Sequence, residues 1–283
     1  MAHVDHGKTT LSDCLISSNN IISAKSAGQM RYLDSREDEQ QRQITMKASS
    51  IGLIHAYNKP QQKADDPVTE EHHLVNLIDS PGHVDFSVEV SSAVTLSDGA
   101  LVLIDCVEGV SPQTQTVIRQ AWRAKVKTCL VLNKLDRLMK VKFEDASQIY
   151  LTLQQIIEQA NTIISELILG DSIKKEAESG HKYTDDEIEK AEEEHFYSPE
   201  KGNVAFASAY DNWAFTLQSI APRIAKQFPG MNPNVLKRFL WGKFYYKQSE
   251  KKIVKSPPNP DSEELFVKFV MKPLVQLYLK HMP

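Results

Sequence analysis

Residues 2–9 read Ala-His-Val-Asp-His-Gly-Lys-Thr, and this stretch decides the fold class. It fits the phosphate-binding pattern G-x-x-x-x-G-K-[ST], except that alanine takes the first glycine position. Gly7 leaves backbone amides open to phosphate oxygens, Lys8 brings a positive charge to the β- and γ-phosphates, and the Thr9 hydroxyl is a ligand for Mg²⁺. A helix over residues 8–18 would point its positive end at the same anion. The stretch therefore predicts a nucleotide phosphate site.

A second motif follows an expected strand. Asp79-Ser-Pro-Gly-His83 begins at the last residue of the strand expected at 74–79. A carboxylate at the C-terminal end of a strand can hold Mg²⁺, directly or through water. Gly82 offers a backbone N–H to the γ-phosphate with no side chain in the way. We therefore expect Asp79 to be a metal ligand and Gly82 to bind the nucleotide.

A third motif, Asn133-Lys-Leu-Asp136, also follows an apolar run and addresses the base. Asp136 can accept two N–H bonds from the edge of guanine, whereas adenine would leave that carboxylate unpaired. Lys134 is placed to lie over the base, and Asn133 is placed to brace the loop and the base. This motif predicts a preference for guanine.

The last motif, Ser208-Ala-Tyr210, ends the final apolar run, and it places the Ala209 amide near the carbonyl oxygen of guanine. Each short match is by itself common in turns. Four matches in this order, each at the end of an expected strand, predict GTP binding. The residues expected to contact the nucleotide are Asp5, His6, Gly7, Lys8, Thr9, Thr10, Gly82, Asn133, Lys134, Asp136, Ser208, Ala209 and Tyr210.

Apolar runs alternate with helical stretches along the chain. We expect strands at residues 50–57, 74–79, 100–105, 128–133 and 203–208. We expect helices at residues 8–18, 84–97, 112–124, 143–169 and 265–281, with a polar loop at 58–71. This alternation predicts an α/β fold, a doubly wound and mainly parallel sheet with helices on both faces.

Composition excludes several classes of protein. The chain has 283 residues, of which 41% are hydrophobic and 25% are charged, as is usual for a globular protein with a sizeable core. It has no run of about 18 apolar residues that would span a membrane, and no secretory signal at its start. Its 3 cysteines are too few for a disulfide framework. We therefore expect an intracellular, cytoplasmic protein that does not interact with membranes.

The net charge of −4 conceals two patches of opposite sign. Residues 171–201 hold 11 acidic and 5 basic side chains, whereas residues 222–283 hold 4 acidic and 12 basic ones. We expect residues 169–202 to be a solvated, partly disordered surface insertion, with a contact to a specific partner as the alternative.

Taken together, these motifs resemble translation-factor GTPases of the elongation factor two class, and the resemblance covers essentially the whole chain. It implies a P-loop GTPase domain over residues 1–221, which includes the acidic insertion, and the start of an accessory subdomain at 222–283. The stretches Arg36-Glu-Asp-Glu-Gln40 and Arg42-Gln-Ile-Thr-Met-Lys47 look like the first switch of this class.

The resemblance also implies roles for single residues. Thr45 would close over Mg²⁺ and the γ-phosphate, so that the metal ligands would be Thr9, Thr45 and Asp79. His83 would orient the attacking water, and His83, Lys8 and Thr45 would form the catalytic set. Val4 and Ile44 match an apolar pair that screens this histidine, and Asp5 matches a position linked to a monovalent cation.

Three stretches favour one branch, the elongation factor-like GTPase of large ribosomal subunit maturation: residues 11–18, 32–40 and 197–203. The acidic insertion also favours it. The resemblance implies that a protein of this branch is a monomer and works with SBDS. It would use GTP to release the anti-association factor from the nascent large ribosomal subunit. The alternative is an elongation factor two-type GTPase that drives translocation.

The basic C-terminal region follows the same resemblance. The stretch Trp241-Gly-Lys-Phe-Tyr-Tyr246 and residues 265–282 look like the accessory subdomain of this class. Lysines interleaved with Phe244, Tyr245 and Tyr246 would let this region contact ribosomal RNA through phosphates and stacking. An ordinary lysine-rich surface over buried aromatic residues is an equally good interpretation.

The chain departs from this class at its two ends. It starts at Met1, immediately before the phosphate loop, where the class has a buried strand, and it ends at Pro283, before the later domains. Losing a central strand removes several apolar side chains worth about 1.5–3 kcal/mol each. A truncated, non-catalytic fragment is therefore the alternative of another class.

Overall fold

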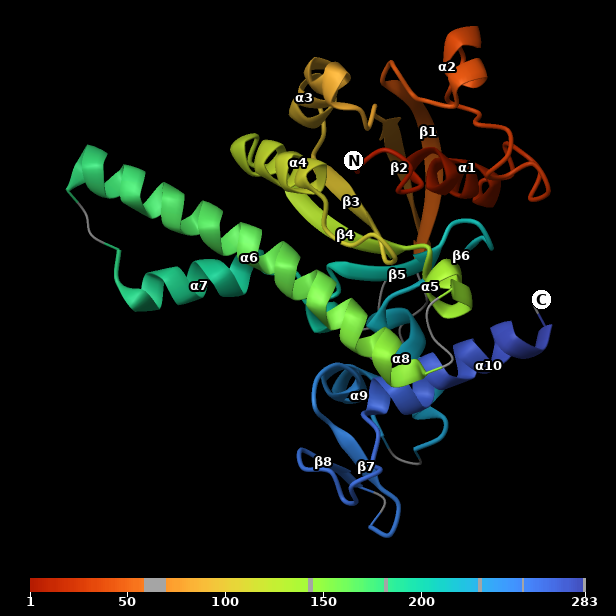
Figure 1. Ribbon diagram of the computed structural model, residues 1–283, viewed down its shortest axis with the longest axis vertical. Helices are drawn as coiled ribbons and strands as arrows, with labels where there is room; N and C mark the ends of the chain where they lie inside the picture. Colours follow the sequence, from red (N-terminus) through yellow and green to blue (C-terminus); the bar gives the residue numbers. More distant parts are fainter. Residues whose placement is uncertain (59–69, 142–144, 181–182, 229–230, 251, 282–283) are drawn as a thin grey trace.

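The computed structural model describes residues 1–58, 70–141, 145–180, 183–228, 231–250 and 252–281. At its centre is a four-stranded sheet in the order β3-β4-β5-β6 (Figure 1). The strands are β3 (Gly99–Asp105), β4 (Lys127–Asn133), β5 (Val204–Ser208) and β6 (Trp213–Phe215). Strands β3, β4 and β5 are parallel, and β6 returns antiparallel to β5 after a short turn. The prediction of an α/β fold is confirmed.

Side chains alternate across this sheet, and helices cover both faces. On one face Ile104, Leu132 and Phe206 enter the main core, which is covered by α4 (Pro112–Arg123) and α6 (Ala146–Ser179). The opposite face carries a second apolar cluster, in which α1 (Lys8–Ser18) contributes Leu11. The remaining members of that cluster are Ala2, Leu103, Val131, Ala205 and Ala207.

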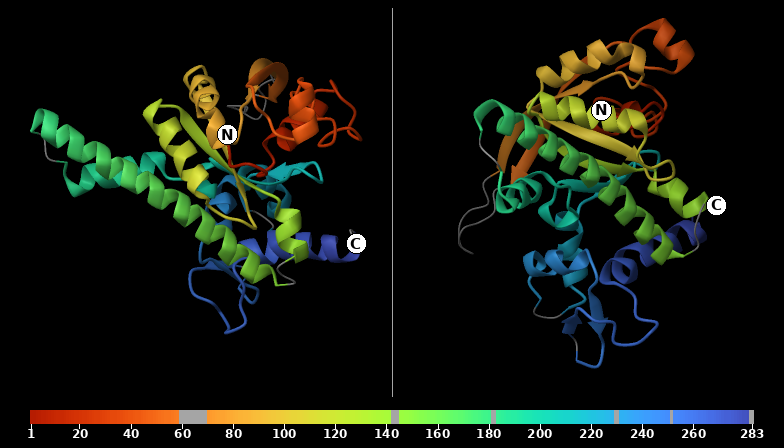
Figure 2. Two further views of the ribbon diagram at one scale, coloured as in Figure 1. Left: turned by 45° about the horizontal axis from the view of Figure 1, so that its top comes forward. Right: turned by 60° about the vertical axis from the view of Figure 1, so that its left-hand side comes forward.

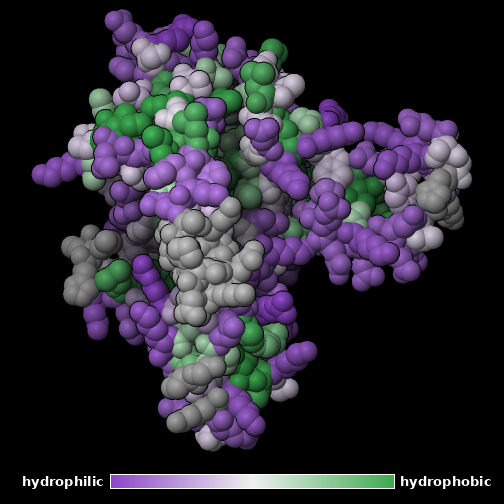
Figure 3. Space-filling model, turned by 180° about the vertical axis from the view of Figure 1, so that it is seen from behind, coloured by the Kyte–Doolittle hydropathy of each residue, from purple (hydrophilic) through white to green (hydrophobic). Residues whose placement is uncertain are grey.

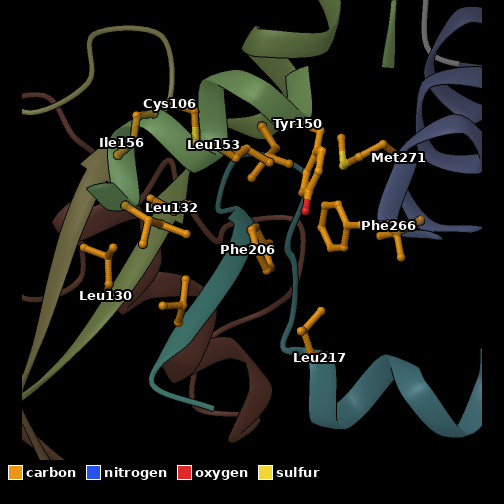
Figure 4. Packing of buried hydrophobic residues seen from close by; sticks show 14 of the residues in the cluster. Cys106, Leu130, Leu132, Tyr150, Leu153, Ile156, Phe206, Leu217, Phe266 and Met271 are labelled. Atoms are coloured by element: carbon orange, nitrogen blue, oxygen red, sulfur yellow. The ribbon is translucent and has the colours of Figure 1, made fainter. Parts of the chain in front are cut away.

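The main core continues without a break into the C-terminal part of the chain. Tyr150 on α6 and Phe206 on β5 both pack against Phe266, with ring centroids 5.2 and 5.3 Å apart (Figure 4). Leu217 at the start of α8 (Leu217–Ala225) is buried in the same cluster. The domain boundary expected between residues 221 and 222 therefore falls inside α8, and both sides of it share one core.

Two of the expected strands lie outside the central sheet. The segments expected at 50–57 and 74–79 are β1 (Ser49–Asn58) and β2 (Glu70–Asp79), which pair with each other in an antiparallel hairpin. In the part of the chain that the structure describes, only Met1 and Ala2 meet the free edge of β3. The Leu103 N–H donates to the Met1 carbonyl at 2.9 Å, and Ala2 forms a single parallel bridge with Leu103. The central sheet is mainly parallel, as expected, and β1 and β2 form a separate antiparallel hairpin outside it.

A groove of about 770 Å³ separates the two sheets. It lies between β2 and β3, and Leu11 and Leu15 of α1 and Val94 contribute to its lining. At one end the Met1 amine donates a hydrogen bond to the Leu101 carbonyl at 2.8 Å. Leu74 in the wall of the groove is 70% exposed, so the groove is an open apolar surface.

The acidic insertion is mostly helical, which corrects the expectation of a partly disordered segment. Helix α6 continues to Ser179, and α7 (Asp185–His195) packs back against it (Figure 2). Thr184 caps α7 in a capping box with Glu187, and most residues of α7 are good helix formers. None of the α7 residues is buried, and this two-helix arm is mainly hydrophilic on the face in Figure 3. The helix start expected at residue 143 and most of the loop at 58–71 lie outside the described residues.

The remaining elements surround these layers. They are α2 (Glu37–Arg42), α3 (Ser87–Thr95), α5 (Leu135–Val141), α9 (Pro233–Leu240), β7 (Tyr245–Lys247), β8 (Lys252–Val254) and α10 (Lys272–His281). Short 3₁₀ turns stand at Val84–Phe86 and Pro199–Lys201, and a π-helical turn at Val267–Met271 precedes α10. Among the described residues, every helix is too short or too polar to cross a lipid bilayer.

Candidate nucleotide-binding site

The predicted motifs gather at the carboxyl edge of the central sheet. Asp105 and Asn133 are register partners at the ends of β3 and β4, and Ser208 ends β5 beside them. This edge, outside the carboxyl ends of parallel strands, is where open α/β sheets bind ligands.

The phosphate loop has the shape its sequence predicts. Gly7 has a φ of +92°, a conformation that strongly favours glycine, and it precedes the first turn of α1. A Cβ added at Gly7 would lie 2.5 Å from Asn133 Nδ2, so a larger residue would push the two loops apart. No side chain in the described part of the chain caps α1, and its first N–H groups remain available to an anion.

Lys8 and Gly82 are in close contact. The Lys8 ammonium donates to the His3 carbonyl at 3.1 Å, and a Cβ at Gly82 would collide with this ammonium. Burial lowers the pKa of Lys8, and the Asp79 carboxylate opposes that shift. The second motif thus meets the phosphate loop at its lysine.

The predicted metal ligands also come together. Thr9 Oγ1 and Thr45 Oγ1 are 3.1 Å apart, close to the distance of about 2.9 Å between adjacent vertices of a Mg²⁺ octahedron. Asp79 is 4% exposed, and its Oδ2 has no hydrogen-bond partner among the described residues. Burial raises the pKa of this carboxyl, which the nearby Lys8 ammonium opposes, so an additional cation would favour its ionised form. The residues present fit Mg²⁺.

Two buried carboxylates that were not predicted, Asp34 and Glu39, stabilise the segment expected to be the first switch. Asp34 accepts a hydrogen bond from Thr45 Oγ1 at 2.8 Å, which fixes the Thr45 hydroxyl beside Thr9. Glu39 accepts hydrogen bonds from the backbone N–H groups of Met46 and Lys47, both at 2.9 Å. Burial raises the cost of an unpaired carboxylate, so these bonds stabilise the conformation of residues 34–47. The contact of Thr45 with Thr9 then joins this segment to the phosphate loop. Their only signal in the sequence is their place within the acidic stretch before Thr45.

A pocket of about 290 Å³ collects the predicted base-binding residues. Asn133 stands between two loops, because its Nδ2 donates to the His6 carbonyl at 2.9 Å and its Oδ1 accepts from the Ala209 N–H at 3.0 Å. Tyr210 is 83% exposed at the pocket. The residues that line this pocket are Gly7, Thr10, Asn133, Lys134, Asp136, Arg137, Ala209 and Tyr210.

Charged groups in this pocket are held in place by neighbours. Asp136 is 6% exposed, and its Oδ1 accepts a hydrogen bond from Ser208 Oγ at 2.8 Å. Lys134, at a φ of +61°, places its ammonium 2.8 Å from Asp105. Burial would raise the pKa of Asp105, but Lys134 and the Val107 amide hold it below its usual range. Asp105 was not predicted, although it ends a strand as Asp79 does.

Three predicted residues make their described contacts elsewhere. His83 lies in its own loop, with Nδ1 3.3 Å from the Asp85 carboxylate and its ring 6.2 Å from that of Phe86. His6 is buried beneath the phosphate loop, and its Nδ1 is 3.2 Å from the Leu103 carbonyl. Asp5 is exposed and has a φ of +62°.

Comparison with known proteins agrees with this geometry. The family described as Elongation factor Tu GTP binding domain matches residues 1–283. The chain belongs to this family. The chain is 44% identical to Elongation factor-like GTPase 1 of Homo sapiens and 44% identical to Ribosome assembly protein 1 of Schizosaccharomyces pombe. It is 43% identical to Ribosome assembly protein 1 of Saccharomyces cerevisiae.

These matches cover 98% of the chain but only 25% to 27% of each relative, so the chain spans about a quarter of their length. The resemblance predicted from the motifs, to translation-factor GTPases and to their elongation factor-like branch, is confirmed. The roles of the individual site residues stay predictions.

Proposed function

We propose that the chain binds GTP with Mg²⁺ and hydrolyses it. One observation carries this proposal: Asn133 joins the phosphate loop to the base loop, through the His6 carbonyl and the Ala209 amide. One end of this arrangement offers free helix N–H groups to phosphate, and the other offers Asp136 to a guanine edge.

Lys8, Thr9, Thr45 and Asp79 would act at the phosphates. Mg²⁺, when bound, would neutralise charge that develops on the phosphate oxygens. Thr9 and Thr45 would be direct ligands, and Asp79 would hold the ion directly or through water. Phosphoryl transfer needs little covalent chemistry from the protein, so positioning and charge are the main contributions of these residues.

We assign the orientation of the attacking water to His83. Its imidazole is 39% exposed, and Asp85 lies beside Nδ1, which leaves Nε2 as the nitrogen for the water. Hydrolysis would then release Thr45 and the Gly82 amide, so that both switch segments relax.

In its full-length context, we propose that this domain drives release of the anti-association factor from the nascent large ribosomal subunit, together with SBDS, in the cytoplasm. Support comes from relatives named for ribosome assembly, at 43% to 44% identity. We expect a monomer whose basic C-terminal region faces ribosomal RNA. Translocation in protein synthesis is the alternative role.

Base specificity provides the direct test. Asp136→Asn should shift preference from GDP to xanthosine diphosphate, because an amide matches the N1–H and C2 carbonyl of xanthine. Competition against a fluorescent GDP analogue should show GDP affinity falling by about 100-fold, from the loss of charged hydrogen bonds.

Asp186→Asn on the exposed arm is the matched control and should leave both affinities unchanged. An unchanged ratio of the two affinities in Asp136→Asn would rule out the assigned role. Binding of GDP without any GTP turnover on ribosomal subunits would instead support the non-catalytic alternative.

A further inference from the structure

A chain of hydrogen bonds runs from the base pocket to the C-terminal helix. Ser208 Oγ lies 2.8 Å from Asp136 Oδ1 and 3.2 Å from Asp211 Oδ2. Tyr278 on α10 donates a hydrogen bond to the same Oδ2 of Asp211. Trp213 Nε1 donates to the Tyr278 hydroxyl oxygen at 2.7 Å. Residues separated by more than 140 positions in the sequence, Asp136 and Tyr278, are thus joined through two side chains.

The number of donor protons decides which group donates and which accepts in each of these hydrogen bonds. An indole N–H can only donate, so the Tyr278 oxygen accepts from Trp213 and its own proton goes to Asp211. Ser208 has a single hydroxyl proton, for which Asp136 and Asp211 compete. Because Tyr278 already donates a proton to Asp211 Oδ2, that oxygen competes less strongly for the Ser208 proton, which goes to Asp136, in agreement with the shorter of the two distances.

We propose that Tyr278 is a positioning residue for guanine recognition, which acts through Asp211 and Ser208 to fix the Asp136 carboxylate. The proposal rests on the proposed function, since it assigns a control of affinity to the same guanine site. In this proposal, α10 controls how tightly the site binds the guanine base of GDP or GTP.

The surroundings of Tyr278 suit a fixed donor. Its side chain is 3% exposed, and burial, together with the hydrogen bond to Asp211, raises its pKa, so the hydroxyl keeps its proton at neutral pH. Helix α10 packs against α5, the helix that carries Asp136, and the Lys140 ammonium of α5 lies 5.8 Å from the centre of the Tyr278 ring. Both ends of the hydrogen-bond chain therefore belong to elements that touch.

The test compares GDP with inosine diphosphate, which lacks the 2-amino group of guanine. Tyr278→Phe should weaken GDP binding by about five- to tenfold, the value of one hydrogen bond, and should weaken inosine diphosphate less. A purely structural defect would weaken both nucleotides equally. The affinities would be measured by competition with a fluorescent GDP analogue on the whole chain.

Two further variants complete the test. Tyr197→Phe is the matched control, because it removes a buried tyrosine hydroxyl that bonds Thr128 at 2.7 Å, away from the pocket. Asp211→Asn, added to Tyr278→Phe, removes the competing carboxylate and should restore GDP affinity.

The outcomes separate the two claims. If the wild-type chain binds GDP, and the ratio of GDP affinity to inosine diphosphate affinity is the same in Tyr278→Phe as in Tyr197→Phe, the positioning role is overturned. The proposed function would then still stand. A loss of affinity that Asp211→Asn does not restore would overturn the positioning role as well. A wild-type chain that binds neither nucleotide would overturn the proposed function, and the positioning role with it.

Discussion

Single side chains hold the loops of the site together, and Asn133 carries two of these contacts. Its side-chain amide donates to the His6 carbonyl and accepts from the Ala209 N–H, so this one side chain sets the distance between the phosphate loop and the base loop. Gly7 then has no room for a side chain, because a Cβ would reach Asn133. At this scale, the geometry of the site follows from hydrogen bonds that only a few residue types can make.

The buried imidazole of His6 provides a prediction for pH. Burial lowers its pKa below the ordinary value of about 6.5, so the unfolded chain binds this proton more readily than the folded one does. The free energy of unfolding should therefore fall as the pH drops below about 6.5, with a slope from this group of at most about 1.4 kcal/mol per pH unit. His6→Asn should reduce that slope in denaturant unfolding between pH 5 and 7.5.

Other groups contribute slopes of their own to this experiment. Burial raises the pKa of Asp13 and Asp79, which works in the opposite direction, so the difference between wild type and variant is the quantity to compare. His55→Asn on the exposed surface of β1 is the control. Identical slopes for wild type and His6→Asn would contradict the assignment.

At the scale of elements, two helices have the same type of N-terminal cap, but only one of them packs into the core. Ser111 caps α4 and Thr184 caps α7, each within a capping box. Helix α4 places Ile118 and Ala121 in the core, whereas no residue of α7 is buried. Loss of the cap should therefore affect the whole domain in one case and a local helix in the other.

We expect Ser111→Ala to lower the melting temperature by about 2 °C or more, because a cap contributes about 1 kcal/mol. Thr184→Ala should leave the melting temperature within about 1 °C while backbone amides of α7 exchange about fivefold faster. Differential scanning calorimetry and hydrogen exchange would measure the two effects. Equal shifts of the melting temperature would show that the arm unfolds together with the core.

At the scale of the whole molecule, the groove between β2 and β3 is an open apolar surface. Met1 and Ala2 occupy one end of it, and burial lowers the pKa of the Met1 amine to about 5, with added repulsion from Lys8.

Fusing seven residues rich in Val and Ile in front of Met1 should stabilise the fold. The added segment would extend the parallel bridge along β3 and bury apolar side chains against Leu74 and Leu101. We expect the free energy of unfolding to rise by about 3 kcal/mol, from one or two side chains at about 1.5–3 kcal/mol each. Urea unfolding compared with a Gly/Ser extension of equal length measures this, and equal midpoints would show that the groove does not accept a strand.

The local sequence predicted much of the fold and the composition of the site. Helix α1 has the expected bounds, and the strands that end at Asp105, Asn133 and Ser208 end where the apolar runs end. These features depend on short-range patterns, namely apolar runs and turn residues. The helical arm was missed because a polar, acidic composition does not distinguish a solvated helix from a disordered segment.

Other features were decided only by the tertiary structure. Strands β1 and β2 read like sheet strands, yet their sequence does not say which neighbours they pair with, and they form a separate hairpin. Asp34 has only a weak local signal and Tyr278 has none, since their contacts with Thr45 and Asp211 join residues that are not neighbours in the sequence. The sequence by itself determined the four loops and hence the residues of the proposed site, because each loop is a local motif. The tertiary structure decided what holds those loops in register, because hydrogen bonds between distant residues exist only after folding.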